Sequence, residues 1–90
     1  MYKLRFTTKF QRNLKLMKKR GKDLNKLNEV LELLVKGQEL PMKYNDHSLI
    51  GNFIGCRECH IEPDWLLVYE VVNNELIIIL TATGTHSDLF

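Results

Sequence analysis

The chain has 90 residues, of which 44% are hydrophobic, and a formal net charge of +2. This length supports one hydrophobic core and excludes a second, so residues 1–90 are expected to form a single domain. No apolar run reaches the roughly 18 residues of a membrane helix, and the N-terminal MYKLRFTTKF lacks the apolar core of a signal peptide. We therefore expect a cytoplasmic protein without membrane association, whose two cysteines stay reduced.

The charge is divided unevenly along the chain. Residues 1–45 carry 12 lysines and arginines against 4 acidic residues, whereas residues 46–90 carry one arginine against 7 acidic residues. Between Lys3 and Lys22 there are nine basic residues and no acidic one. Such a stretch is either an ordinary solvated helix face or a surface for a polyanion, which could be nucleic acid or an acidic protein.

The first half of the chain predicts one strand and two helices. Alternating apolar residues indicate a strand over 2–6, and apolar residues three and four apart indicate helices over 8–20 and 23–36. Gly21 and Gly37 are the expected helix stops. The two helices should form a hairpin whose apolar stripes pack on a sheet.

The second half predicts the rest of that sheet. An irregular connection over 38–51 leads to strands over 52–61, 65–72 and 75–82, with Asn73-Asn74 as a two-residue hairpin turn. The resulting order is β-α-α-β-β-β. It predicts an α+β domain with a mostly antiparallel sheet and a helical hairpin on one face.

The segment CRECH at residues 56–60 has the spacing of a c-type haem attachment site. In an extended strand, however, Cys56 and Cys59 point to opposite faces, because their separation of three is odd. They therefore cannot share one haem, one zinc ion or one disulfide, and a zinc site would also need a second ligand pair. We interpret both as ordinary strand thiols and expect no cofactor.

Three histidines and an aspartate lie at the ends of predicted elements: His47, His60, Asp64 and His86. Histidines with a carboxylate suit proton transfer near neutral pH, and a three-histidine metal site is the competing interpretation. Metal-free RNA cleavage uses such an inventory, since a base activates the ribose 2′-OH, an acid protonates the departing 5′ oxygen, and cations stabilise the phosphorane. Trp65 and Phe90 offer flat surfaces for an unpaired base, although Trp65 could equally fill the core.

Three segments resemble the YafQ-like branch of the RelE/ParE toxins of bacterial toxin–antitoxin pairs: NDHSL at 45–49, GCRECHIEPDWLLVY at 55–69 and TGTHSDLF at 83–90. The resemblance also includes the helix junction KRGKDLNKL and spans nearly the whole chain. It implies a RelE-like domain of the microbial-ribonuclease type that cuts messenger RNA in the ribosomal A site without a metal. It also implies silencing by an acidic, flexible antitoxin, with a monomeric free toxin and a complex of higher order.

Carried over by residue, the resemblance assigns His47, His60, Asp64 and His86 to a catalytic groove. His86 is the expected general acid and Asp64 or His60 the expected base, with His47 orienting the ribose and phosphate. Arg57 matches an arginine of the family in the same strand and is an expected substrate contact. Strand alternation leaves open whether its side chain faces the phosphate.

The sequence departs from the family pattern at Ala82, where relatives often carry arginine. Loss of that cation should weaken phosphorane stabilisation by about 2–4 kcal/mol. Either Arg57 or a lysine substitutes, or activity is reduced, or this copy is an inactive partner of an acidic protein. A further alternative is a ParE-like toxin that binds a topoisomerase without cutting RNA, although such an inhibitor has no need of three histidines and an aspartate around one groove.

Overall fold

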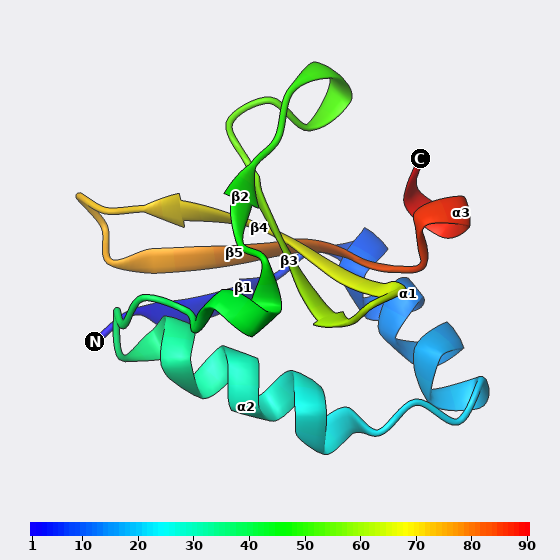
Figure 1. Ribbon diagram of the computed structural model, residues 1–90. Coiled ribbons are helices and arrows are strands. Elements are labelled where there is room, and N and C mark those ends of the chain that lie inside the picture. The colour runs from blue at the N-terminus through cyan, green and yellow to red at the C-terminus, as the bar shows by residue number, and fades with distance from the viewer.

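The computed structural model describes residues 1–90. In chain order, its elements are β1 (Lys3–Phe6), α1 (Thr8–Lys19), α2 (Leu24–Val35), the 3₁₀ helix η1 (Met42–Tyr44), β2 (His47–Ser48), the 3₁₀ helix η2 (Gly51–Phe53), β3 (Arg57–Glu62), β4 (Trp65–Val72), β5 (Ile77–Gly84) and α3 (His86–Leu89). The helices α1 and α2 lie on one side of the sheet, and the loop between β2 and β3 projects on the other side (Figure 1).

Five strands form one sheet in the order β1-β5-β4-β3-β2. The first strand lies parallel to the last, and every other neighbouring pair is antiparallel. This topology confirms the predicted α+β class and the mostly antiparallel sheet. It also places the first and last strands, β1 and β5, side by side. More than 70 residues separate Lys3 from its partner Ile77 along the chain.

Local sequence signals set the ends of the two long helices. Thr7 and Asp23 cap α1 and α2, since each side chain accepts a hydrogen bond from a backbone N–H of the first turn. Gly21 and Gly37 follow the last turns with φ of 83° and 71°, which confirms both as helix stops. The helices are too short and too polar for a membrane-spanning segment.

The core lies between the helices and the sheet. Its members are buried apolar side chains from both layers: Phe10, Met17, Leu27, Val30, Leu34, Tyr44, Cys59, Ile61, Trp65, Leu67, Tyr69, Ile78 and Leu80. Cys59 is completely buried there, and this burial raises the pKa of its thiol to about 12. Both cysteines are free thiols, and Cys56 precedes β3 rather than lying within it.

The start of β3 and the turn between β4 and β5 differ from the predictions. The strand expected from residue 52 begins at Arg57, because residues 51–53 form η2 and the connection before it contains the short strand β2. The turn after β4 is not a two-residue hairpin, since Val72 pairs with Ile77 and leaves four residues in the loop. Leu76 therefore lies in that loop with a φ of 55°, which leucine rarely adopts.

The short C-terminal helix α3 was not predicted. Thr85 accepts a hydrogen bond from the Asp88 backbone, and the Asp88 carboxylate accepts one from the Thr85 backbone, so the two residues form a reciprocal capping box. The sequence signal was the T-x-x-D spacing at residues 85–88. This helix matters because its first residue is His86.

Candidate active site

Cross-strand pairing defines a row of residues on the sheet face that points away from the helices. His47 of β2 pairs with Glu58 of β3, Glu58 pairs with Val68 of β4, and Val68 pairs with Ala82 of β5. Residues opposite each other in paired strands share one face of a sheet. Cys59 lies in the helix-covered core, so its neighbours Glu58 and His60 lie on the other face.

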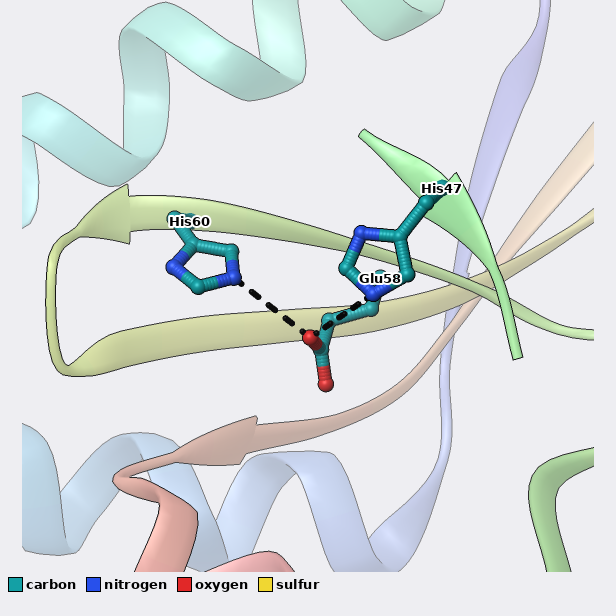
Figure 2. A group of neighbouring side chains, drawn as sticks. All are labelled: His47, Glu58 and His60. Atoms are coloured by element: carbon teal, nitrogen blue, oxygen red, sulfur yellow. Dashed lines mark ion pairs between the residues drawn. The ribbon is translucent and has the colours of Figure 1, made fainter. Parts of the chain in front are cut away.

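Glu58 joins two of the histidines. One carboxylate oxygen, Oε1, lies 3.2 Å from His47 Nε2 and 3.5 Å from His60 Nε2. Figure 2 shows both contacts converging on that oxygen, with His47 reaching over from β2 and His60 from the same strand as Glu58. Glu58 is only 4% exposed, so this carboxylate is held in place rather than solvated.

Both of these rings also face a backbone carbonyl with their other nitrogen. His47 Nδ1 lies 2.8 Å from the carbonyl oxygen of Asn45, and His60 Nδ1 lies 3.3 Å from that of Pro63. A neutral imidazole carries one N–H, so it can donate to one of its two oxygen neighbours. Each ring therefore completes both contacts only when it carries a second proton or binds a cation at Nε2.

His86 forms a separate pair with Asp64. Its ring Nδ1 lies 2.9 Å from Asp64 Oδ1, and its backbone N–H donates to the same oxygen at 3.1 Å. These two hydrogen bonds from His86 lower the pKa of Asp64 below its ordinary value. The pair links the turn between β3 and β4 to the first residue of α3.

The two groups adjoin each other through His60. Its ring centroid lies 6.1 Å from that of His47 and 5.8 Å from that of His86. The three imidazoles thus form a row with His60 in the middle. The Glu58 carboxylate contacts both His47 and His60, and the Asp64 carboxylate contacts His86. The structure brings together all four residues that the sequence assigned to a groove.

Ion pairing fixes the helix that carries His86. Arg20 at the end of α1 donates to both Asp88 oxygens, at 2.7 and 3.1 Å, and holds the pKa of Asp88 well below its usual range. Gly84 permits α3 to fold back on β5, because a Cβ at this position would lie 2.9 Å from the Cβ of Asp88. The position of His86 thus depends on α1, β5 and the capping box together.

The prediction that Trp65 stacks on a base is wrong. Its side chain is completely buried among the core residues of the helix-covered face. The indole N–H donates to Thr83 Oγ1 at 2.9 Å, which leaves neither an exposed ring face nor a free polar edge. The alternative interpretation, core filling, is confirmed.

Arg57 does not line the groove. It alternates with Glu58 along β3, so it lies on the same face as Cys59, and its guanidinium donates twice to Asp46 and once to Ser48. The hydrogen bonds that Arg57 donates to Asp46 raise the pKa of the guanidinium. Arg57 therefore does not point toward the expected phosphate position. It also does not replace the cation that relatives often carry at position 82, where this chain has a buried alanine in the groove-facing row.

Sequence reasoning missed Glu58 as a site residue. The signal was its position two residues before His60 in a strand, which places both side chains on one face. The sequence does not show that β2 pairs with β3, and this pairing brings His47 to the same carboxylate oxygen of Glu58.

The residues around Glu58 could also hold a metal ion. His47, Glu58 and His60 offer one ligand atom each, and these atoms all lie within 4.8 Å of one another. Two imidazoles and a carboxylate suit divalent transition metals. The arrangement therefore fits two kinds of chemistry, proton transfer and metal binding.

Comparison with known proteins identifies the family. Residues 2–90 match the family described as the bacterial toxin of type II toxin–antitoxin systems, YafQ. The mRNA interferase toxin YafQ of Escherichia coli strain K12 is 38% identical over 88 residues, which cover 97% of this chain and 94% of that protein. The crystal structure of a metal-bound toxin from Helicobacter pylori superimposes with a TM-score of 0.93 at 41% identity and full coverage of both chains. The E. coli DinJ–YafQ complex superimposes with a TM-score of 0.91 at 36% identity, over 100% of this chain and 99% of that one. This chain therefore belongs to the YafQ family of type II toxins.

Proposed function

We propose that this chain is an mRNA interferase, a toxin that inhibits translation by cutting messenger RNA on the ribosome. The observation that carries this proposal is the row of three imidazoles with two carboxylates, Glu58 between His47 and His60 and Asp64 on His86. The name of the E. coli relative, mRNA interferase toxin, supports the same activity. We propose further that residues 1–90 form a single toxin domain and that the family is a branch of the RelE/ParE superfamily.

His86 is the proposed general acid. Asp64 accepts a hydrogen bond from Nδ1 at 2.9 Å, so the ring is oriented and its Nε2 stays available for the departing 5′ oxygen. The side chain of His86 is 55% exposed, which leaves it accessible to a polymeric substrate.

His60 is the proposed base that takes the proton from the ribose 2′-OH, acting in the neutral form in which only one of its two ring nitrogens donates a hydrogen bond. Asp64 is the alternative, but both of its contacts with His86 go to one carboxylate oxygen, which favours an orienting role for it. The 5.8 Å between the centroids of His60 and His86 is short enough for one phosphodiester linkage to contact both rings, since each contact reaches about 2.6–3.2 Å. Attack by the 2′ oxygen on phosphorus then breaks the bond to the 5′ oxygen, which leaves with the proton of His86.

His47 and Glu58 are proposed to orient the reacting linkage. Glu58 holds the rings of His47 and His60 through one oxygen, so the position of each ring depends on the other. No arginine comes from β5, where Ala82 is buried, and protonated histidines would supply part of the charge that stabilises the phosphorane.

The ribosome and an acidic antitoxin are the proposed partners, and the cytoplasm is the proposed location. Nine basic residues between Lys3 and Lys22, without one acidic residue, support a surface for ribosomal RNA or an acidic protein around α1. The E. coli relative has been crystallised with DinJ. We propose that a comparable acidic partner binds this basic surface, with an affinity that falls as salt rises.

One experiment tests the catalytic assignment. The chain is expressed inducibly as wild type, His86→Ala, Asp64→Ala and the control Glu75→Ala, which removes an exposed carboxylate from the β4–β5 loop. Translation arrest and mapped messenger cleavage should persist in the control and disappear in both site variants. Cleavage that survives both substitutions would contradict the assignment, and arrest with intact messages and damaged DNA would favour the ParE-like alternative.

Metal binding is a second candidate function of the same site. The close spacing of donor atoms in His47, Glu58 and His60 supports it, as does the metal-bound toxin from H. pylori. A divalent ion there would occupy His60 and remove the proposed base. We therefore expect cleavage to continue in a chelator and to be inhibited by added Zn²⁺ or Cu²⁺; a requirement for the ion would contradict the metal-free mechanism.

A further inference from the structure

We infer that Asp46, Arg57 and Tyr69 are positioning residues for His47. These three side chains, called the Asp46 network below, meet on the face of the sheet that the helices cover. They hold the residues on either side of His47, so that its ring stays against Glu58 on the opposite face. This inference rests on the mRNA-cleaving function proposed above, in which His47 orients the reacting linkage.

Backbone pairing alone fixes His47 weakly. The strand β2 contains only two residues and lies at the edge of the sheet, so a single neighbouring strand pairs with it. No regular element longer than three residues occurs between α2 and β3. The side chain of His47 is 43% exposed, so surrounding atoms do not enclose it either. A segment with so few contacts opens easily unless side chains hold it in place.

Asp46 accepts hydrogen bonds from two different strands. Arg57 of β3 donates to Oδ2 from Nε at 3.1 Å and from Nη2 at 3.0 Å, and Tyr69 of β4 donates to Oδ1 at 2.5 Å. Arg57 also donates from Nη1 to Ser48 Oγ at 3.0 Å. One guanidinium thus binds both neighbours of His47 in the sequence, and its rigid, planar fork fixes how far apart they lie.

The strand register places this network directly beside the histidines. Ser48 pairs with Arg57 and Arg57 pairs with Tyr69, which makes a cross-strand row on the helix-covered face. The next row, one residue along each strand, contains His47 and Glu58 and lies on the groove face. Successive side chains of a strand point to opposite faces, so a fixed first row also fixes the direction of His47. Tyr69 is buried in the core, which ties the network to the best-packed part of the fold.

Asp46→Asn and Tyr69→Phe test the network with nearly unchanged side-chain shapes. The amide that Asp46→Asn introduces accepts hydrogen bonds at only one of its two polar atoms, and Tyr69→Phe removes one donor. Nuclear Overhauser spectra of the imidazole rings measure the arrangement directly, since the ring centroids of His47 and His60 lie 6.1 Å apart and those of His60 and His86 lie 5.8 Å apart. The first contact should weaken in both variants. The second should persist, because α3 is held from α1 instead.

Single-turnover cleavage of a message on programmed ribosomes shows whether the position of His47 matters for the reaction. Asp46→Asn should slow cleavage about 10- to 100-fold, since a displacement of about 1 Å can slow a reaction about 100-fold. Tyr69→Phe should show the same pattern with a smaller slowing, and it carries the test if Asp46→Asn does not fold. In a His47→Ala background, either substitution should change the rate by less than about twofold, because the network then has no ring to position.

Matched controls remove the same chemical groups elsewhere. Tyr2→Phe removes a tyrosine hydroxyl that donates to Asn73 at 2.6 Å, and Asp23→Asn replaces the exposed cap of α2 with a side chain that caps helices equally well. Both controls should keep the two ring contacts and the wild-type cleavage rate. Thermal unfolding of each variant establishes that the proteins compared are folded.

The outcomes separate this inference from the proposed function. Unchanged ring contacts in a folded Asp46→Asn protein would overturn the inference and leave the function standing. Equal slowing with and without His47 would also overturn it, since the network would then act on the fold in general, and so would a lost ring contact with wild-type cleavage. A wild type that does not cleave messages, but loses the contact between His47 and His60 in Asp46→Asn, would overturn the proposed function alone.

Discussion

Gly84→Ala should abolish most activity while leaving the fold intact. The added Cβ would lie 2.9 Å from Asp88 Cβ and 3.0 Å from Asp88 Oδ2. Carbon atoms pack best at about 3.5–4.0 Å, so the contact is roughly 0.6–1.1 Å too short. Gly84 has no positive φ, so its backbone suits alanine and the strain can be relieved only by moving α3. Overpacking of this kind costs about 1–3 kcal/mol.

The functional effect should exceed the effect on stability, because α3 carries His86. A displacement of about 1 Å in a catalytic group can slow a reaction by about 100-fold. Single-turnover cleavage of a message on programmed ribosomes measures this rate, and urea unfolding measures stability. The control is Gly37→Ala at the end of α2, where a φ of 71° makes alanine unfavourable by about 1 kcal/mol. We expect the control to lose stability and keep its cleavage rate. A Gly84→Ala protein that cleaves like the wild type would refute the claim that close packing of α3 positions His86.

Three further predictions follow from the same contacts. Trp65→Phe should destabilise the protein by about 1–3 kcal/mol in urea unfolding, because the hydrogen bond to Thr83 and part of the buried volume are lost. The cleavage rate of the folded protein should stay unchanged; unchanged stability with a reduced cleavage rate would instead support base stacking by Trp65. Asp88→Asn should make the free energy of unfolding depend less steeply on pH at acid pH. Arg20 lowers the pKa of Asp88 in the folded state, so the pair stabilises the fold above the ordinary aspartate pKa of about 3.9, and this contribution is lost as the pH falls toward the lowered value; equal slopes in both proteins between pH 5 and pH 2 would contradict it. Asp64 should remain ionised above about pH 4, since its pKa is lowered. Asp64→Asn should therefore reduce kcat at every pH from 5 to 8 and leave the shape of the pH–rate profile unchanged. Loss of one limb of that profile in the variant would show that Asp64 itself titrates in this range.

The sequence predicted the elements whose signals are local. Helices with apolar residues three and four apart, glycine stops and capping side chains need only neighbouring residues, and both long helices appear within one or two residues of their predicted bounds. Strand alternation likewise predicted that Cys56 and Cys59 do not share a face, and Cys59 lies in the helix-covered core. The turn at Leu76 was missed because its positive φ is set by the pairing of β4 with β5, and leucine gives no local indication of it.

The site residues also fall into two groups: those that the sequence identified and those whose role depends on the tertiary structure. Residue types alone identified His47, His60, Asp64 and His86, because few side chains transfer protons near neutral pH. Tertiary structure alone decided that Glu58 joins two of them, that Trp65 is buried and that Arg57 turns away toward Asp46. These facts depend on which strands become neighbours and which face the helices cover. Such contacts connect residues that are far apart along the chain, and no local pattern of spacing encodes them.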